Sequence, residues 1–186
     1  KFFLVWTTTP WTLPANISLA VNKDLTYVEI KKESEIFIVG KSKSSLINGE
    51  IIKEFQGKDL EGVKYKGIFD ELTGVKLKED DHRVILWEDV TEEEGTGIVH
   101  IATGCGEEDY KLGKELNLSI IDLLDDESRY RNGFGFLEGK LATEVNEEIF
   151  ENLKEKNVLY KIEDYTHRYP FCWRCESPLL YYALDT

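Results

Sequence analysis

The side chains that could do chemistry gather in three stretches, and the first is rich in threonine. Thr7, Thr8 and Thr9 follow an apolar run and precede Pro10. Side chains alternate along a strand, so we expect Thr7 and Thr9 on one face and Thr8 on the other. Because proline cannot donate to a strand ladder, hydroxyls and backbone amides beyond it can meet a ligand. The same residues also suit an ordinary strand end, where threonine is favoured by its β-propensity.

The second stretch, residues 95–110, has the pattern of a strand, a glycine loop and the start of a helix. If Val99 and Ile101 fill the core, alternation turns His100 outward beside the loop. Asp109 falls in the first turn of the expected helix, where the helix dipole favours a carboxylate. A structural histidine and an ordinary first-turn carboxylate are the alternative. The loop does not match a phosphate-binding loop, which ends in Lys followed by Ser or Thr.

The third stretch contains Cys172 and Cys175 in a C-x-x-C pair. Such a pair supplies half of a four-ligand zinc site, and Cys105 is the only other cysteine. A thioredoxin-like redox pair would need a βαβ context that the pattern lacks. We therefore predict no metal site completed by this chain. The sequence also contains neither G-x-S-x-G nor H-E-x-x-H, so an enzymatic interpretation cannot depend on a serine nucleophile or a zinc-bound water.

Many short strands and a few helices are expected to position these residues. Period-two patterns predict strands at residues 2–8, 17–21, 27–32, 35–39, 51–56, 83–88 and 97–102. Helical spacing of apolar residues predicts helices at residues 107–116 and 144–156. Residues 12–16 are expected to be a loop, residues 125–139 a mobile loop, and residues 158–169 an extended stretch. We predict an α+β fold, a β-barrel-centred domain with a few peripheral helices, occupying residues 1–186 as a single domain.

Composition narrows the class of protein. The chain has 186 residues, of which 41% are hydrophobic, enough for one domain with a core. Its net charge of -13 opposes non-specific binding to nucleic acid, which needs Lys and Arg to meet phosphates. Three cysteines make no disulfide framework, and no apolar run is long enough to cross a bilayer. We expect a cytoplasmic protein without membrane contact, and a piece of a longer polypeptide that folds alone.

Together the three stretches resemble signatures of the isoleucyl-tRNA synthetases, a family of class I aminoacyl-tRNA synthetases. The run from Thr7 to Asn16 is similar to the family's threonine-rich signature. The related valyl and leucyl enzymes instead carry Arg-Pro after the paired threonines. Residues 95–110 resemble the second editing signature, Gly-Thr-Gly-x-Val-His-x-Ala-Pro with a glycine loop and Asp-Tyr. Residues 167–183 resemble the segment that rejoins the catalytic body, so residues 167–186 are expected to lead back to it.

The resemblance implies an editing domain that hydrolyses valine wrongly attached to isoleucine tRNA and spares isoleucyl-tRNA. One methylene is worth only about 1–3 kcal/mol in a binding pocket, so a second site must remove what the first admits. The implied partners are the 3′ end of aminoacylated tRNA and the ATP-binding catalytic and tRNA-binding domains of the same polypeptide. No cofactor is implied for editing. Cys172 and Cys175 would form a half-site for zinc in the full-length parent, paired with another C-x-x-C upstream.

The resemblance also implies roles for particular residues. Asp109 would anchor the α-ammonium of the misattached amino acid, and His100 would limit the size of its side chain. The candidate catalytic residues are Asp109, Thr7, Thr8, Thr9 and His100. The candidate substrate-binding residues are Trp11, Asn16 and Tyr110. No residue stands out as a general base.

Two positions depart from the family pattern. Thr103 stands where the family usually has proline, and Cys105 stands where a bulkier residue is expected. Both departures are expected to loosen the loop that positions Asp109. A non-catalytic barrel that binds RNA or a protein partner is the alternative function, and a zinc-dependent structural module is a third.

Overall fold

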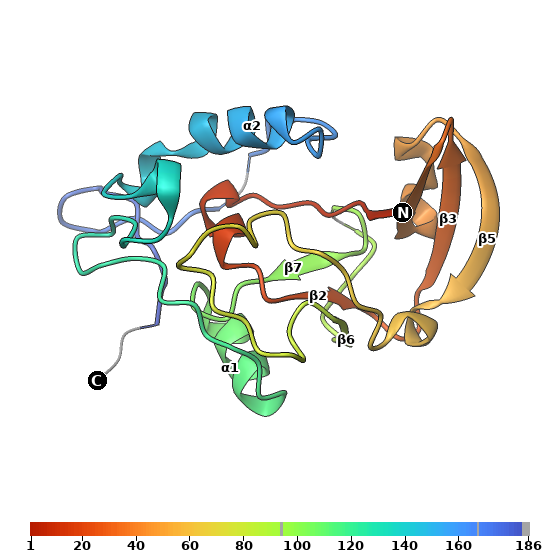
Figure 1. Ribbon diagram of the computed structural model, residues 1–186, viewed down its shortest axis with the longest axis horizontal. Coiled ribbons are helices and arrows are strands. Elements are labelled where there is room, and N and C mark those ends of the chain that lie inside the picture. Colours follow the sequence, from red (N-terminus) through yellow and green to blue (C-terminus); the bar gives the residue numbers. More distant parts are fainter. Residues whose placement is uncertain (94, 167, 184–186) are drawn as a thin grey trace. The chain divides into compact units, whose positions relative to one another are not determined.

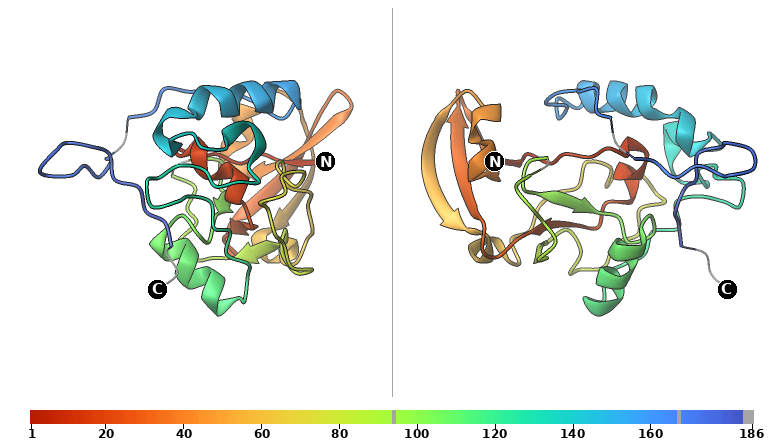
Figure 2. Two further views of the ribbon diagram at one scale, coloured as in Figure 1. Left: turned by 60° about the vertical axis from the view of Figure 1, so that its left-hand side comes forward. Right: turned by 180° about the vertical axis from the view of Figure 1, so that it is seen from behind.

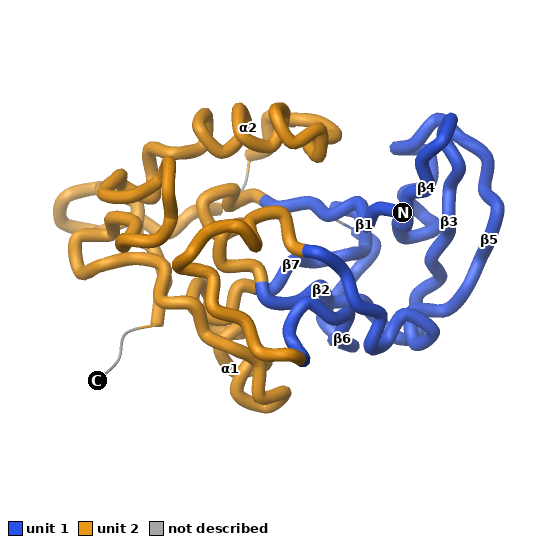
Figure 3. The backbone as a smooth tube through the Cα atoms, viewed as in Figure 1, with its two compact units in different colours: residues 1–7, 17–66, 80–101 blue, residues 8–16, 67–79, 102–186 orange. Residues whose placement is uncertain are grey.

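The computed structural model describes residues 1–93, 95–166 and 168–183. Their contacts divide the chain into two compact units (Figure 3). The first unit combines residues 1–7, 17–66 and 80–101, and the second combines residues 8–16, 67–79 and 102–186. The threonine run and the second stretch therefore each contribute residues to both units. The interpretation of residues 1–186 as one domain stays a prediction.

The first unit carries two small sheets. The larger has the strand order β1-β4-β3-β5, built from β1 (Phe2–Phe3), β3 (Thr26–Lys32), β4 (Glu35–Gly40) and β5 (Glu50–Gln56). In it β3 is antiparallel to both β4 and β5, and Figure 1 shows β3 and β5 side by side. The smaller has the order β6-β2-β7, built from β2 (Ser18–Val21), β6 (Val84–Leu86) and β7 (Val99–Ile101). There β2 is parallel to β6 and antiparallel to β7.

A tyrosine and a glycine fix the approach to β7. Tyr27 is fully buried among Leu19, Val21 and Ile98, and its hydroxyl donates to the Gly97 carbonyl oxygen at 2.7 Å. Gly97 has a φ of +77°, which L side chains rarely adopt, so glycine is required there. The backbone turn ahead of His100 is therefore set by buried contacts within the first unit.

The second unit carries both α-helices, α1 (Glu107–Glu115) and α2 (Asn146–Glu155). It also holds the short 3-10 helices η1 (Pro10–Ala15), η4 (Gly135–Leu137) and η5 (Ala142–Glu144), while the first unit holds η2 (Lys41–Leu46) and η3 (Gly57–Leu60). Helix α2 buries Ile149 and Leu153 and packs beside η1, as both views of Figure 2 show. The two predicted helices are confirmed within a residue or two at each end. No described helix is long and apolar enough to span a membrane.

The α+β class is confirmed, but the expected barrel is not. Among the described residues the strands form two separate sheets, and β6 and β7 are each only three residues long. A barrel needs an unbroken ring of pairing with matched stagger. Ladders this short cannot supply it, and β5, at the edge of its sheet, is exposed along most of its length.

Three local predictions were wrong. The strand expected at residues 2–8 is regular only at β1, and Trp6 adds a single bridge to Val99. The loop expected at residues 12–16 is largely η1, whose first residue is Pro10, a position that suits the fixed φ of proline. The segment expected to be mobile, residues 125–139, is packed instead, with Tyr130, Phe134 and Leu137 at most 2% exposed.

Candidate active site

The threonine run lies where the chain passes from the first unit to the second, between Thr7 and Thr8. Thr8 is exposed, whereas Thr7 and Thr9 are half-buried, but none of the three lies in a strand, so strand alternation does not explain the difference. Thr9 precedes η1, and its carbonyl oxygen accepts from the backbone N–H of Thr12 at 3.0 Å and from the Thr12 hydroxyl at 2.9 Å. The run is therefore folded tightly against the start of η1.

Helix η1 presents two of the predicted binding residues. Trp11 is 7% exposed, and the hydroxyl of the buried Tyr130 donates to its carbonyl oxygen at 2.6 Å. Asn16 follows η1, is half-buried, and donates its backbone N–H to the Leu13 carbonyl oxygen at 3.1 Å. Sequence reasoning missed Tyr130, because nothing in its spacing separates it from an ordinary core residue.

Asp109 lies in the first turn of α1. The helix begins directly after residues 102–106, which we call the Asp109 loop. The Asp109 Oδ2 accepts the backbone N–H of Ala102 at 2.8 Å. The loop closes on itself, because the Cys105 N–H donates to the Ala102 carbonyl oxygen at 2.7 Å. Burial raises the pKa of Asp109 to about 6. The hydrogen bond from Ala102 lowers this pKa, and the charge of Glu108 raises it. Asp109 is half-buried, so its carboxylate has lost part of the water that surrounds an exposed one.

Cys105 and Tyr130 lie beside this carboxylate. Burial, and then the charge of Asp109, raise the pKa of the Cys105 thiol. Burial, and then Cys105, raise the pKa of the Tyr130 hydroxyl. Cys105 itself is half-buried. The loosening expected from Cys105 stays a prediction.

Thr103 is firmly held. It is fully buried, and its hydroxyl donates to the Ser119 carbonyl oxygen at 2.5 Å. The loosening expected from a residue other than proline stays a prediction, although Thr103 is buried and hydrogen-bonded. Threonine supplies a hydrogen bond that proline could not.

His100 lies in the first unit, in the middle of β7, where it pairs with Leu19 of β2. The expected outward imidazole is wrong, because the residue is only 8% exposed. Both faces of β7 are covered, because Ile101 is fully buried on one face and His100 itself is buried on the other. Burial lowers the pKa of His100 to about 4, so the imidazole is neutral at pH 7. Its role as a size limit stays a prediction.

Tyr110, the last predicted binding residue, is the next residue after Asp109 in α1 and is half-buried. The Lys114 ammonium lies 5.2 Å from the centroid of its ring. This contact occupies one side of the ring, and an assignment to substrate binding stays a prediction.

The C-x-x-C pair lies on a tight turn of the second unit. The Cys172 N–H donates to the Ser177 carbonyl oxygen at 2.8 Å, and the Glu176 N–H donates to the Cys172 carbonyl oxygen at 2.9 Å. The Cys175 thiol donates to the Ser177 hydroxyl at 3.3 Å, and hydrogen bonds from Ser177 lower its pKa. Among the described residues no three His, Cys, Asp or Glu side chains group as a metal site. A zinc half-site at this turn stays a prediction. His167 and residues 184–186, which belong to the predicted connecting segment, lie outside the described residues.

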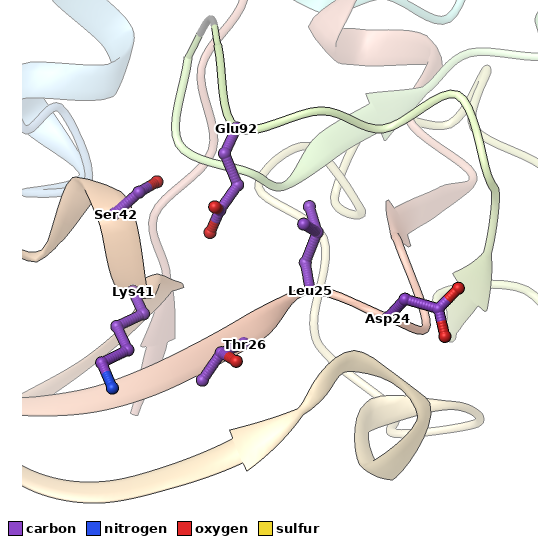
Figure 4. Close-up of a pocket in the computed structure, with 6 residues that line it drawn as sticks. All are labelled: Asp24, Leu25, Thr26, Lys41, Ser42 and Glu92. Carbon is purple, nitrogen blue, oxygen red and sulfur yellow. The ribbon is translucent and has the colours of Figure 1, made fainter.

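An open hollow of the first unit is unrelated to these residues. Figure 4 shows its lining, which comprises Asp24, Leu25, Thr26, Lys41, Ser42 and Glu92. It contains none of the predicted site residues. Lys41 is already paired with Glu54 at 2.8 Å, so we assign the hollow no role.

The fold places the chain in a class of protein. It matches no protein-family model. It is similar to the crystal structure of GlLeuRS-CP1, with a TM-score of 0.70 and 14% identity, over 83% of this chain and 80% of that one. It is also similar to the editing domain of the Plasmodium knowlesi cytosolic leucyl-tRNA synthetase, with a TM-score of 0.60 and 10% identity, over 97% of this chain and 83% of that one. The chain therefore has the fold of the editing domains inserted into aminoacyl-tRNA synthetases.

Sequence relatives narrow the class further. The chain is 43% identical over 189 residues to the isoleucine–tRNA ligase of Clostridium tetani, covering all of this chain and 18% of the ligase. It is 40% identical over 200 residues to the isoleucine–tRNA ligase of Pyrococcus horikoshii, covering all of this chain and 19% of the ligase. The chain is thus homologous over its whole length to a segment of the isoleucine–tRNA ligases, which confirms the resemblance in its motifs. It spans about a fifth of the length of these relatives.

Proposed function

We propose that this chain hydrolyses the ester bond of valyl-tRNA(Ile) and spares isoleucyl-tRNA(Ile). The observation that carries the proposal is Asp109, a desolvated carboxylate at the start of α1 in a chain homologous to isoleucine–tRNA ligases. One backbone N–H satisfies Oδ2. A buried carboxylate is stabilised most by a cation placed against it. The α-ammonium of an aminoacyl ester is such a cation.

The chemistry proposed is direct attack by water. Water adds to the ester carbonyl carbon, the bond from that carbon to the ribose oxygen breaks, and valine and a tRNA with an intact ribose hydroxyl leave. The proton of the water passes to that ribose oxygen, so no covalent intermediate on the protein is required. Fixing the ammonium at Asp109, with Thr7, Thr8, Thr9 and Asn16 orienting substrate and water, would lower the barrier by positioning. Trp11 and Tyr110 would contribute apolar surface.

His100 suits a wall better than a base. A general base works best when its pKa lies near the working pH, and the pKa of His100 is held at about 4. A neutral, rigidly packed imidazole can exclude a side chain that is one methylene too large. We therefore assign His100 to the rejection of isoleucine.

The proposal includes a division of labour with the rest of a longer polypeptide. With a net charge of -13, the chain would bind only the aminoacylated 3′ end, and other domains of the ligase would hold the tRNA body and activate isoleucine with ATP. No cofactor takes part in editing. Zinc, if held by the parent, would use Cys172 and Cys175 with ligands outside this chain. The setting is the cytoplasm, where translation occurs.

Deacylation of charged tRNA tests the proposal. The chain should release valine from valyl-tRNA(Ile) well above the buffer rate and leave isoleucyl-tRNA(Ile) intact. Asp109→Ala should lose about tenfold to a hundredfold, because a hydrogen bond to a charged group is worth roughly 1.5–3 kcal/mol. The matched control is Glu108→Ala, which removes an exposed carboxylate from the same helical turn. No valine release by the folded wild-type chain would favour the alternative, a non-catalytic binding domain.

A further inference from the structure

Helix α1 carries Asp109 and Gly113 on the same face, because they are four residues apart. Gly113 is the one buried residue of α1. A Cβ added there would lie 2.5 Å from the Thr103 methyl carbon and 3.0 Å from its Cβ. The face of α1 that bears Asp109 therefore lies so close to Thr103 that a side chain at position 113 would overlap it.

Thr103 is itself fixed from the opposite direction. Its hydroxyl donates to the Ser119 carbonyl oxygen at 2.5 Å, and its neighbour Gly104 lies against the Ile121 carbonyl oxygen, where a Cβ would overlap it. The segment that follows α1 thus anchors the Asp109 loop. The Leu118 N–H donates to the Gly113 carbonyl oxygen at 2.9 Å, which ties that segment back to the helix.

These contacts determine where the carboxylate lies. Ala102, the residue before Thr103, donates its N–H to Asp109 at 2.8 Å. If Thr103 moved away from Gly113, the distance between Ala102 and Asp109 would change with it. We propose that Thr103 is a positioning residue: its hydrogen bond to Ser119 holds it against the side-chain-free surface of Gly113, and this sets the place of Asp109. The activity measurements that test this inference rest on the proposed function, whereas the measurement of the Asp109 pKa rests on the structure alone.

The first experiment separates the hydroxyl from the methyl. Thr103→Val keeps the shape and removes the hydrogen bond, and should lower kcat/KM for valine release by about threefold to tenfold. Thr103→Ser keeps the hydrogen bond and should stay within about twofold of wild type. The matched control is Ile149→Val in α2, a buried site of the same unit, which should lower stability without lowering deacylation by the folded protein. Equal activity of Thr103→Val and wild type would overturn the proposal.

The second experiment uses the packing against Gly113. Gly113→Ala should displace α1 and lower kcat/KM by about tenfold, because its methyl meets the Thr103 methyl. Adding Thr103→Ser removes the opposing methyl and should restore much of the loss. A double variant no better than Gly113→Ala would show that the contact does not position Asp109.

A third readout does not require catalysis. The pKa of Asp109, about 6 in the packed site, can be followed by carboxyl-carbon NMR in each variant. It should fall in Thr103→Val and Gly113→Ala, because a displaced carboxylate regains water, and should stay unchanged in Thr103→Ser and Ile149→Val. An unchanged pKa in Thr103→Val would refute the positioning role. A pKa that responds in a chain without deacylase activity would uphold it and refute the proposed function instead.

Discussion

Replacing Asp109 with asparagine should make the folded chain more stable and the editing reaction slower. The pKa of Asp109 is about 6 when folded, against an ordinary value of 3.8. The difference, 6 − 3.8 ≈ 2.2, corresponds to about 3 kcal/mol at 1.36 kcal/mol for each pKa unit. This is an upper value, because the asparagine amide must also leave water. We expect Asp109→Asn to gain about 1–3 kcal/mol in the free energy of unfolding at pH 7.

The sign follows from the protons bound in each state. Below pH 3.8 the carboxyl is protonated whether the chain is folded or unfolded, so its burial costs little. Between pH 3.8 and about 6 the folded chain keeps a proton that the unfolded chain has lost, and stability falls as pH rises. Above pH 6 the full cost is present. The difference between Asp109→Asn and wild type should therefore grow from pH 4 to pH 6 and then level off.

Urea unfolding at pH 4 and pH 7, together with valine release at pH 7, tests both parts. The asparagine can still accept the Ala102 N–H through its amide oxygen, so the loop should stay folded. Deacylation should fall about tenfold to a hundredfold, because the neutral amide cannot pair with an ammonium. The titration of His100 is present in both proteins and cancels in the comparison. An Asp109→Asn variant that is less stable at pH 7 and fully active would refute the reasoning.

Three further outcomes are expected. His100→Ala should release isoleucine from isoleucyl-tRNA(Ile) while valine release persists; a fall in both activities would identify a base instead, and continued protection of isoleucine would place the size limit elsewhere. Deacylation should survive EDTA, and should also survive replacement of Cys172 and Cys175 by serine; a loss restored by zinc would contradict the assignment. Uncharged tRNA should bind more weakly than about 1 μM at physiological salt, because a chain with a net charge of -13 repels phosphates. An aminoacyl-adenosine analogue should still be recognised, and submicromolar binding of uncharged tRNA would refute the expectation.

Regular elements with clear periodicity could be predicted from the sequence, and so could the place of Asp109. Helix α2 was predicted because Ile149 and Leu153 follow Val145 at helical spacing, and all three are buried. Asp109 was placed in the first turn of a helix by the glycine loop before it, and it lies there. Local patterns suffice in these cases, because each element is specified by its own residues.

The contacts that shape the site could not be predicted in this way. The spacing of Tyr110, Leu112 and Leu116 predicted helix α1. The one buried residue of that helix, however, is Gly113. A glycine in a helix usually costs stability, and only its contact with Thr103 explains it. The burial of His100 depended on what covers both faces of β7, which alternation along one strand does not determine. Such facts belong to packing between segments distant in sequence.

The charges at the start of α1 also indicate which part of a charged tRNA, its phosphates or its amino acid, this chain would recognise. A helix N-terminus ordinarily attracts phosphate, because its N–H groups and dipole present positive charge. Here the first turn carries Glu107, Glu108 and Asp109, and Asp109 already accepts the Ala102 N–H. Glu107 is paired with Lys111 at 2.6 Å, which leaves the half-buried Asp109 carboxylate to oppose a phosphate and favour a cation. The only cation that an aminoacylated 3′ end offers is the ammonium of the amino acid, so the charges at this turn favour an editing domain over a module that binds the RNA backbone.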